Sequence, residues 1–129
     1  CWAMRARIAQ HRLRRDGRWQ TIDAPRELAG VISSREVPRP LLIDCLTLWL
    51  SNTLLAGADL TAETDRLIDA FAAAEGPIVA VSNEVGMGIV PDTPLGRQFR
   101  DAQGRLNQRL AAIADRVFLL AAGLPLTLK

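Results

Sequence analysis

The chain has 129 residues, of which 49% are hydrophobic and 23% are charged. This composition predicts one globular domain with a modest core and excludes a disordered or fibrous protein. The longest apolar run, residues 41–50, is interrupted by Asp44 and Thr47 and is shorter than the roughly 20 residues that a membrane span needs. A net charge of +2 does not require nucleic acid or a membrane as a partner. We therefore expect neither.

The cysteines and the first residues indicate the compartment. Cys1 and Cys45 have the spacing of neither a zinc site nor a disulfide framework, which favours a reducing, cytoplasmic setting. The sequence begins Cys1-Trp2-Ala3, without an initiator Met and without the charged and apolar stretches of a signal peptide. We expect a cytoplasmic protein that is either a fragment or the product of an interrupted reading frame.

Helical patterns occupy the N-terminal part. Residues 4–15 carry Met4, Ile8 and His11 at helical spacing, which predicts an amphipathic helix that ends before Asp16. Pro25 opens a second short helix over residues 26–33, because proline suits the first position of a helix.

Strands and helices alternate in the rest of the chain. Residues 40–45 read as a buried parallel strand that ends in Asp44, and a helix follows over 46–56. Thr61 is the expected N-cap of a helix that runs to residue 75, and a strand follows over 78–82. A long helix is expected over 94–114, a third strand over 117–121 and a fourth over 124–128. This order predicts an α/β domain with a mostly parallel sheet, and an uncovered sheet edge if no strand precedes residue 1.

His11 is the single histidine, and arginines surround it on the predicted helix. Arg7 lies one turn before it, and Arg14 and Arg15 lie one turn after it. An imidazole can attack phosphorus and form a covalent intermediate, and guanidinium groups suit phosphate contacts. The alternative is a half-buried helix histidine without a chemical role in an arginine-rich sequence.

Two carboxylates follow predicted strands. Asp44 is placed to contact Mg²⁺ or nucleotide at a strand end, although such a residue is often only the N-cap of the next helix. Glu84 has the same placement after the next strand, so the two could share one crevice. Alternatively, Asn83 fixes the loop and Glu84 pairs with an arginine of the long helix, either Arg100 or Arg105. The printed sequence contains neither GxxxxGK[ST] nor GxGxxG.

Several blocks together resemble one known family. The block at residues 81–91, VSNEVGMGIVP, is followed by matches at 97–101 and 104–111, and is preceded in the right order by matches at 7–12, 19–23 and 44–52. The sequence is similar in these blocks to the bifunctional cobinamide kinase and cobinamide-phosphate guanylyltransferase of cobalamin biosynthesis. The similarity covers essentially everything after Ala3.

The resemblance implies a RecA-like P-loop fold of three layers, of which residues 1–129 would be the C-terminal part, a single nucleotide-binding domain without the P-loop strand. It implies a homotrimer and two reactions. Adenosylcobinamide is phosphorylated by a nucleoside triphosphate, ATP or GTP, and the product is then guanylylated through a histidine–GMP intermediate to give adenosyl-GDP-cobinamide. Mg²⁺ is expected with the nucleotide.

The resemblance also assigns roles to residues. His11 matches the guanylylated histidine and would attack the α-phosphorus of GTP. Nucleotide contact is implied for Asp44, for Asp23, where the family usually has Glu, and for the segment Arg12, Leu13, Arg14 and Arg15. Because the phosphate-binding loop is missing and Cys1-Trp2-Ala3 departs from the family pattern, we expect inefficient turnover by these residues alone. The alternative is a non-catalytic remnant that only binds nucleotide or associates with intact subunits.

Overall fold

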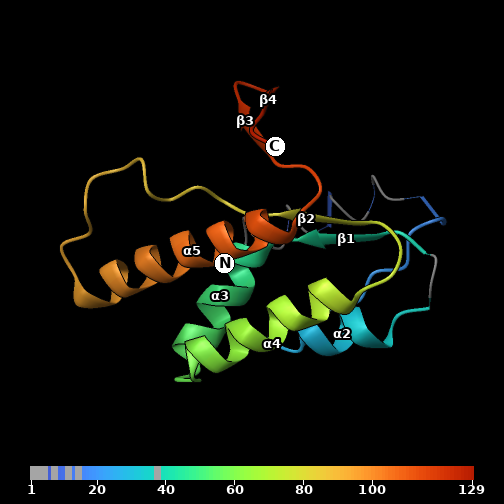
Figure 1. Cartoon of the computed structure of the whole chain (residues 1–129), viewed down its shortest axis with the longest axis horizontal. Coiled ribbons are helices and arrows are strands. Elements are labelled where there is room, and N and C mark those ends of the chain that lie inside the picture. The colour runs from blue at the N-terminus through green and yellow to red at the C-terminus, as the bar shows by residue number, and fades with distance from the viewer. Residues whose placement is uncertain (1–5, 7–8, 11–12, 14–15, 37–38) are drawn as a thin grey trace.

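The computed structural model describes residues 6, 9, 10, 13, 16–36 and 39–129. Its elements lie in the order shown in Figure 1: α2 (Leu28–Ser34), β1 (Leu41–Asp44), α3 (Leu46–Leu55), α4 (Leu60–Ala73), β2 (Ile78–Val81), α5 (Pro94–Ile113), β3 (Phe118–Ala121) and β4 (Leu124–Thr127). The backbone is also helical at Ala6, Ala9, Gln10 and Leu13, in agreement with the helix predicted there. The mixed α/β class is therefore confirmed.

Strands β1 and β2 pair in parallel, as predicted. Leu41 is opposite Ile78 at one end of the ladder, and Asp44 is opposite Val81 at the other. Both strands consequently finish at the same edge. Helices α3 and α4 connect them, and α2 packs beside α4 (Figure 1).

One apolar core joins the helices to β1. It contains Leu28, Ala29 and Ile32 of α2, Ile43 of β1, Leu46, Trp49 and Leu50 of α3, Leu67 and Ala70 of α4, and Leu106 of α5. Trp49 also donates its indole N–H to the Arg26 carbonyl oxygen at 2.9 Å, which fixes the segment before α2 onto α3. Burial of these side chains is the main force that holds the helices in place.

The expectation that the last two strands extend a mostly parallel sheet is wrong. Strands β3 and β4 form an antiparallel hairpin of their own, with Phe118 opposite Thr127, and the hairpin stands apart from the helices (Figure 1). The turn between them places Ala122 at φ 52° and Gly123 at φ 77°. Two consecutive positive φ values are typical of the tight turn that matches hairpin twist, so the chain pairs locally with itself.

Helix boundaries differ slightly from those predicted. Asp59, and not Thr61, caps α4: its carboxylate Oδ1 accepts hydrogen bonds from the backbone N–H of Thr61 at 2.9 Å and of Ala62 at 3.1 Å. The acidic side chain two residues earlier satisfies the free amides, so Thr61 lies inside the first turn. Helix α5 begins as predicted at Pro94, with Thr93 as its cap. No described helix is long and apolar enough to cross a bilayer.

Arg35, just after α2, holds the turn that leads into β2. Its guanidinium donates to the carbonyl oxygens of Arg39 at 3.1 Å, of Pro77 at 3.3 Å and of Gly76 at 3.3 Å, and also to that of Glu75. One planar fork of donors therefore joins the two segments that precede the paired strands.

We expect Arg35→Lys to lower the free energy of unfolding by about 1–2 kcal/mol, because an ammonium group cannot reach the same spread of carbonyl oxygens. Urea unfolding followed by circular dichroism measures this change. Arg105→Lys, at an exposed position of α5, serves as the control and should change stability by less than about 0.5 kcal/mol. Equal effects of the two substitutions would contradict the role assigned to Arg35.

Candidate active site

The carboxyl ends of β1 and β2 carry polar groups that meet across the sheet edge. Asp44 ends β1, is exposed, and lies opposite Val81. Thr47 of α3 then accepts a hydrogen bond on Oγ1 from the Asn83 backbone N–H at 2.9 Å. The segments after the two strands are thus joined directly. In open α/β sheets this edge is where ligands bind.

A second set of hydrogen bonds fixes the end of β2 to α5. Gln103 donates through Nε2 to Ser82 Oγ and to Asn107 Oδ1, both at 2.9 Å, and Ser82 donates to Asn107 Oδ1 at 2.6 Å. Asn107 in turn donates through Nδ2 to the Asn83 carbonyl oxygen at 3.1 Å. We call Ser82, Gln103 and Asn107 the α5 network. Sequence reasoning missed it.

A signal for this network exists in the sequence. Gln103 and Asn107 are four residues apart and therefore share one face of α5. That face is flanked by the buried Leu106. Polar side chains beside an apolar stripe need internal partners, and Gln103 is fully buried. The polar residues of the segment after β2 are the available partners.

Glu84 and Arg100 both make hydrogen bonds to the backbone of the loop after β2. Glu84 Oε1 accepts from the Gly86 backbone N–H at 2.6 Å, and Arg100 donates through Nη2 to the Gly86 carbonyl oxygen at 2.8 Å. The arginine thus binds the loop backbone instead of the Glu84 carboxylate, and Asn83 is fixed through its backbone. Within the described ranges no group of three or more His, Cys, Asp or Glu side chains could hold a metal ion.

Most of the predicted nucleophile segment lies outside the described residues. This applies to His11, Arg12, Arg14 and Arg15. Leu13 is described, and its side chain is 87% exposed. Asp23 is exposed in the irregular segment before α2.

The residues immediately after this segment form a local turn. Asp16 accepts hydrogen bonds from the Arg18 side chain, through Nε at 2.9 Å and Nη2 at 2.5 Å, and from the Arg18 backbone N–H at 3.1 Å. These hydrogen bonds lower the pKa of the Asp16 carboxyl group and raise the pKa of Arg18. Asp16 therefore engages one guanidinium of the arginine-rich region.

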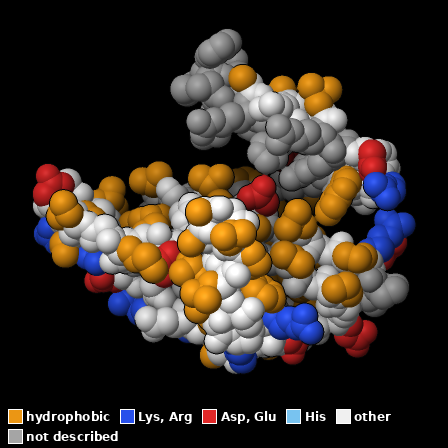
Figure 2. Space-filling model, turned by 90° about the horizontal axis from the view of Figure 1, so that it is seen from above, with side chains coloured by type: hydrophobic (Ala, Val, Ile, Leu, Met, Phe, Trp, Pro, Cys, Tyr) orange, Lys and Arg blue, Asp and Glu red, His pale blue; other side chains and the backbone are white. Residues whose placement is uncertain are grey.

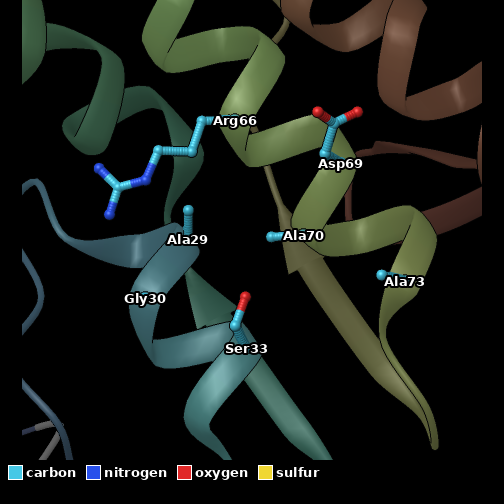
Figure 3. Close-up of a pocket in the computed structure, with 7 residues that line it drawn as sticks. All are labelled: Ala29, Gly30, Ser33, Arg66, Asp69, Ala70 and Ala73. Atoms are coloured by element: carbon cyan, nitrogen blue, oxygen red, sulfur yellow. The ribbon is translucent and has the colours of Figure 1, made fainter.

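A shallow depression of about 420 Å³ lies between α2 and α4 (Figure 3). Its lining residues are Ala29, Gly30 and Ser33 of α2 and Arg66, Asp69, Ala70 and Ala73 of α4. Arg66 donates to Glu27 Oε2 at 3.0 Å. None of the predicted site residues lines this depression, which is away from the strand ends.

A parallel strand pair with helices packed against it and polar groups at its carboxyl edge defines an α/β protein of the kind that binds small molecules at strand ends. Residues 2–128 match the family model described as "Cobinamide kinase / cobinamide phosphate guanyltransferase". The chain belongs to this family, whose members are transferases.

Curated relatives agree with the family match. The chain is 43% identical to the bifunctional adenosylcobalamin biosynthesis protein CobP of Pseudomonas aeruginosa, over 98% of this chain and 75% of the relative. It is 37% identical to the bifunctional adenosylcobalamin biosynthesis proteins CobU of Salmonella typhimurium and of Escherichia coli, in each case over 98% of this chain and 78% of the relative.

Proposed function

We propose that the protein phosphorylates cobinamide and transfers GMP from GTP to cobinamide phosphate in adenosylcobalamin biosynthesis. The family match over residues 2–128 carries this proposal. The bifunctional relatives support it because they align with 98% of the chain. The fold supports it less specifically, since it offers a polar strand edge of the type that binds nucleotides.

His11 is the proposed nucleophile of the guanylyl transfer. Its neutral imidazole attacks the α-phosphorus of GTP, a nitrogen–phosphorus bond forms, and the bond to pyrophosphate breaks. A phosphate oxygen of cobinamide phosphate then attacks the same phosphorus and releases the imidazole. The overall products are GDP-cobinamide, in its adenosyl form, and pyrophosphate. Arg12, Arg14 and Arg15 would offset the charge that develops on the phosphates.

The residues at the strand edge fit a nucleotide that carries Mg²⁺. Proteins usually bind this ion through one or two carboxylates plus substrate phosphates, and Asp44 offers one exposed carboxylate at the strand end. Asp44 would hold the ion directly or through water, and Asp23 and Leu13 would contact the nucleotide. A bound Mg²⁺ would neutralise triphosphate charge and favour departure of pyrophosphate.

The finer architecture is part of the same proposal. We assign residues 1–129 to one nucleotide-binding domain of the RecA-like P-loop type that forms a homotrimer and accepts ATP or GTP in the kinase step. Size-exclusion chromatography with light scattering measures the trimer, and phosphorylation of cobinamide with each nucleotide measures the preference.

The proposal is tested by incubating the chain with GTP, Mg²⁺ and cobinamide phosphate and analysing the products by liquid chromatography and mass spectrometry. A parallel sample contains a version preceded by a GxxxxGKS phosphate loop. We expect GDP-cobinamide and pyrophosphate in equal amounts. Absence of GDP-cobinamide from both samples would contradict the proposed function.

Asp44→Asn is expected to lower kcat/KM for GTP by at least about tenfold, because the amide keeps the shape of the side chain but loses the charge that attracts Mg²⁺. Asp69→Asn, at an exposed position of α4, is the matched control and should leave kcat/KM within about twofold. Raising the Mg²⁺ concentration should partly restore the kcat/KM of the Asp44→Asn variant. An unchanged kcat/KM in Asp44→Asn would contradict the proposed role of Asp44 in binding Mg²⁺.

A further inference from the structure

The loop over residues 83–93 is held firmly at both ends. At its start, Thr47 accepts from the Asn83 N–H and Asn107 donates to the Asn83 carbonyl oxygen, at 2.9 and 3.1 Å. At its end, Arg97 donates through Nη1 to the carbonyl oxygens of Pro91 at 3.0 Å and of Asp92 at 2.9 Å. These bonds fix where the loop leaves the sheet and where it enters α5.

The middle of the same loop is apolar and exposed. Met87 is 79% exposed, Ile89 is 97% exposed and Val90 is 58% exposed. Hydrophobic side chains are exposed across much of the surface seen from above (Figure 2), but these three belong to the segment that follows the ligand-binding edge of the sheet. Because they are exposed, these side chains contribute little to the core and are available to contact a ligand.

Asn83 presents its side-chain amide at the base of this loop. Both of its backbone groups are engaged, whereas among the described residues no hydrogen bond involves its exposed side-chain amide. That amide offers donors and an acceptor together. In the proposed function Asp44 holds the Mg²⁺-bound nucleotide at the same edge, so the second substrate must lie next to it. A ligand with amide groups can pair with the Asn83 amide.

We propose that the 83–93 loop binds the corrinoid substrate, with the Asn83 amide hydrogen-bonded to a carboxamide on the rim of the macrocycle. Met87, Ile89 and Val90 pack against its apolar part. This inference rests on the proposed function, which supplies cobinamide as the substrate. The α5 network positions Asn83 for this contact: Gln103 and Ser82 orient Asn107, and Asn107 holds the Asn83 backbone.

The test compares binding of cobinamide and of GTP by isothermal titration calorimetry in variants of the whole 129-residue chain. Asn83→Ala and Ile89→Ser are each expected to raise the dissociation constant for cobinamide by about tenfold and to change that for GTP by less than about twofold. Neither substitution removes a described side-chain contact within the chain, so the Tm should not change. Leu124→Ser, at a 71% exposed position of the hairpin, is the control and should leave both constants unchanged.

A double substitution tests the positioning role. Because Asn107 acts in part through Asn83, Asn107→Ala should weaken cobinamide binding by itself, and the double variant with Asn83→Ala should weaken it by less than the two single losses combined. If the two losses of cobinamide affinity combine in full in the double variant, the two residues act independently. That result would overturn the positioning role.

Unchanged cobinamide affinity in Asn83→Ala and Ile89→Ser, or an equal loss of GTP affinity, would overturn the loop assignment. Failure of the wild-type chain to bind cobinamide would overturn it as well. The proposed function is measured separately by GMP transfer. Selective loss of cobinamide binding in the variants, together with no GMP transfer by either the chain or its version with a phosphate loop, would leave the loop assignment standing and contradict the proposed function.

Discussion

His11→Ala is expected to abolish covalent labelling of the chain by GTP. In the proposed mechanism the imidazole nitrogen forms the bond to the α-phosphorus, and alanine offers no nucleophile in its place. His11 is the single histidine of the sequence, so no second imidazole can substitute for it. The rate of guanylyl transfer should fall on the order of 10³-fold or more, as expected when a covalent nucleophile is removed.

The measurement is intact-protein mass after incubation with GTP and Mg²⁺. The wild-type chain should gain the mass of one GMP group, and this gain should disappear in acid, because a phosphorus–nitrogen bond to imidazole is acid-labile. Asp16→Ala serves as a control near the same segment, and it should retain the adduct. A GMP adduct that persists in His11→Ala would place the nucleophile elsewhere.

Leu50→Ala should be the most destabilising of the substitutions considered for the core. Leu50 lies on α3 and is 0% exposed. Truncation removes buried methyl groups and leaves a cavity among well-packed neighbours, which costs about 3 kcal/mol and at most about 5. Because a domain of this size has a total stability of roughly 5–15 kcal/mol, much of the chain would unfold in mild denaturant.

Leu55→Ala is the matched control, since it makes the same chemical change on the same helix at a position that is 69% exposed. It should cost less than about 1 kcal/mol. Urea titration of both variants by circular dichroism, with a check that the slopes agree, gives the two free energies. Similar losses at both positions would show that α3 does not contribute its inner face to the core as described.

The alternation of apolar strands and amphipathic helices was sufficient to predict the α/β class and the parallel pairing of β1 with β2. Burial of residues such as Leu67 and Leu106 follows from their helical spacing. The separate hairpin was not predictable from this pattern, because a short apolar strand looks the same whichever partner it has. The turn itself gave only half a signal, since Gly123 tolerates a positive φ whereas Ala122 does not favour one.

The site was predictable in part. A carboxylate after a strand indicated Asp44, and the structure places it at the expected sheet edge. The contacts of Glu84 and Arg100 depended on the path of a loop without periodicity, so the sequence left two alternatives open. The α5 network required knowledge of which buried polar groups face each other, and this depends on how α5 packs on the end of β2. The role of His11 remains a prediction.

The central claim is that GMP passes from GTP through His11 to cobinamide phosphate, and a single-turnover experiment tests it most directly. The chain, or its version with a phosphate loop, is first labelled with GTP and then freed of nucleotide. Cobinamide phosphate is added alone. We predict that the GMP mass leaves the protein as an equal amount of GDP-cobinamide appears. Retention of the GMP adduct in the presence of cobinamide phosphate, or its release as free GMP, would contradict the account.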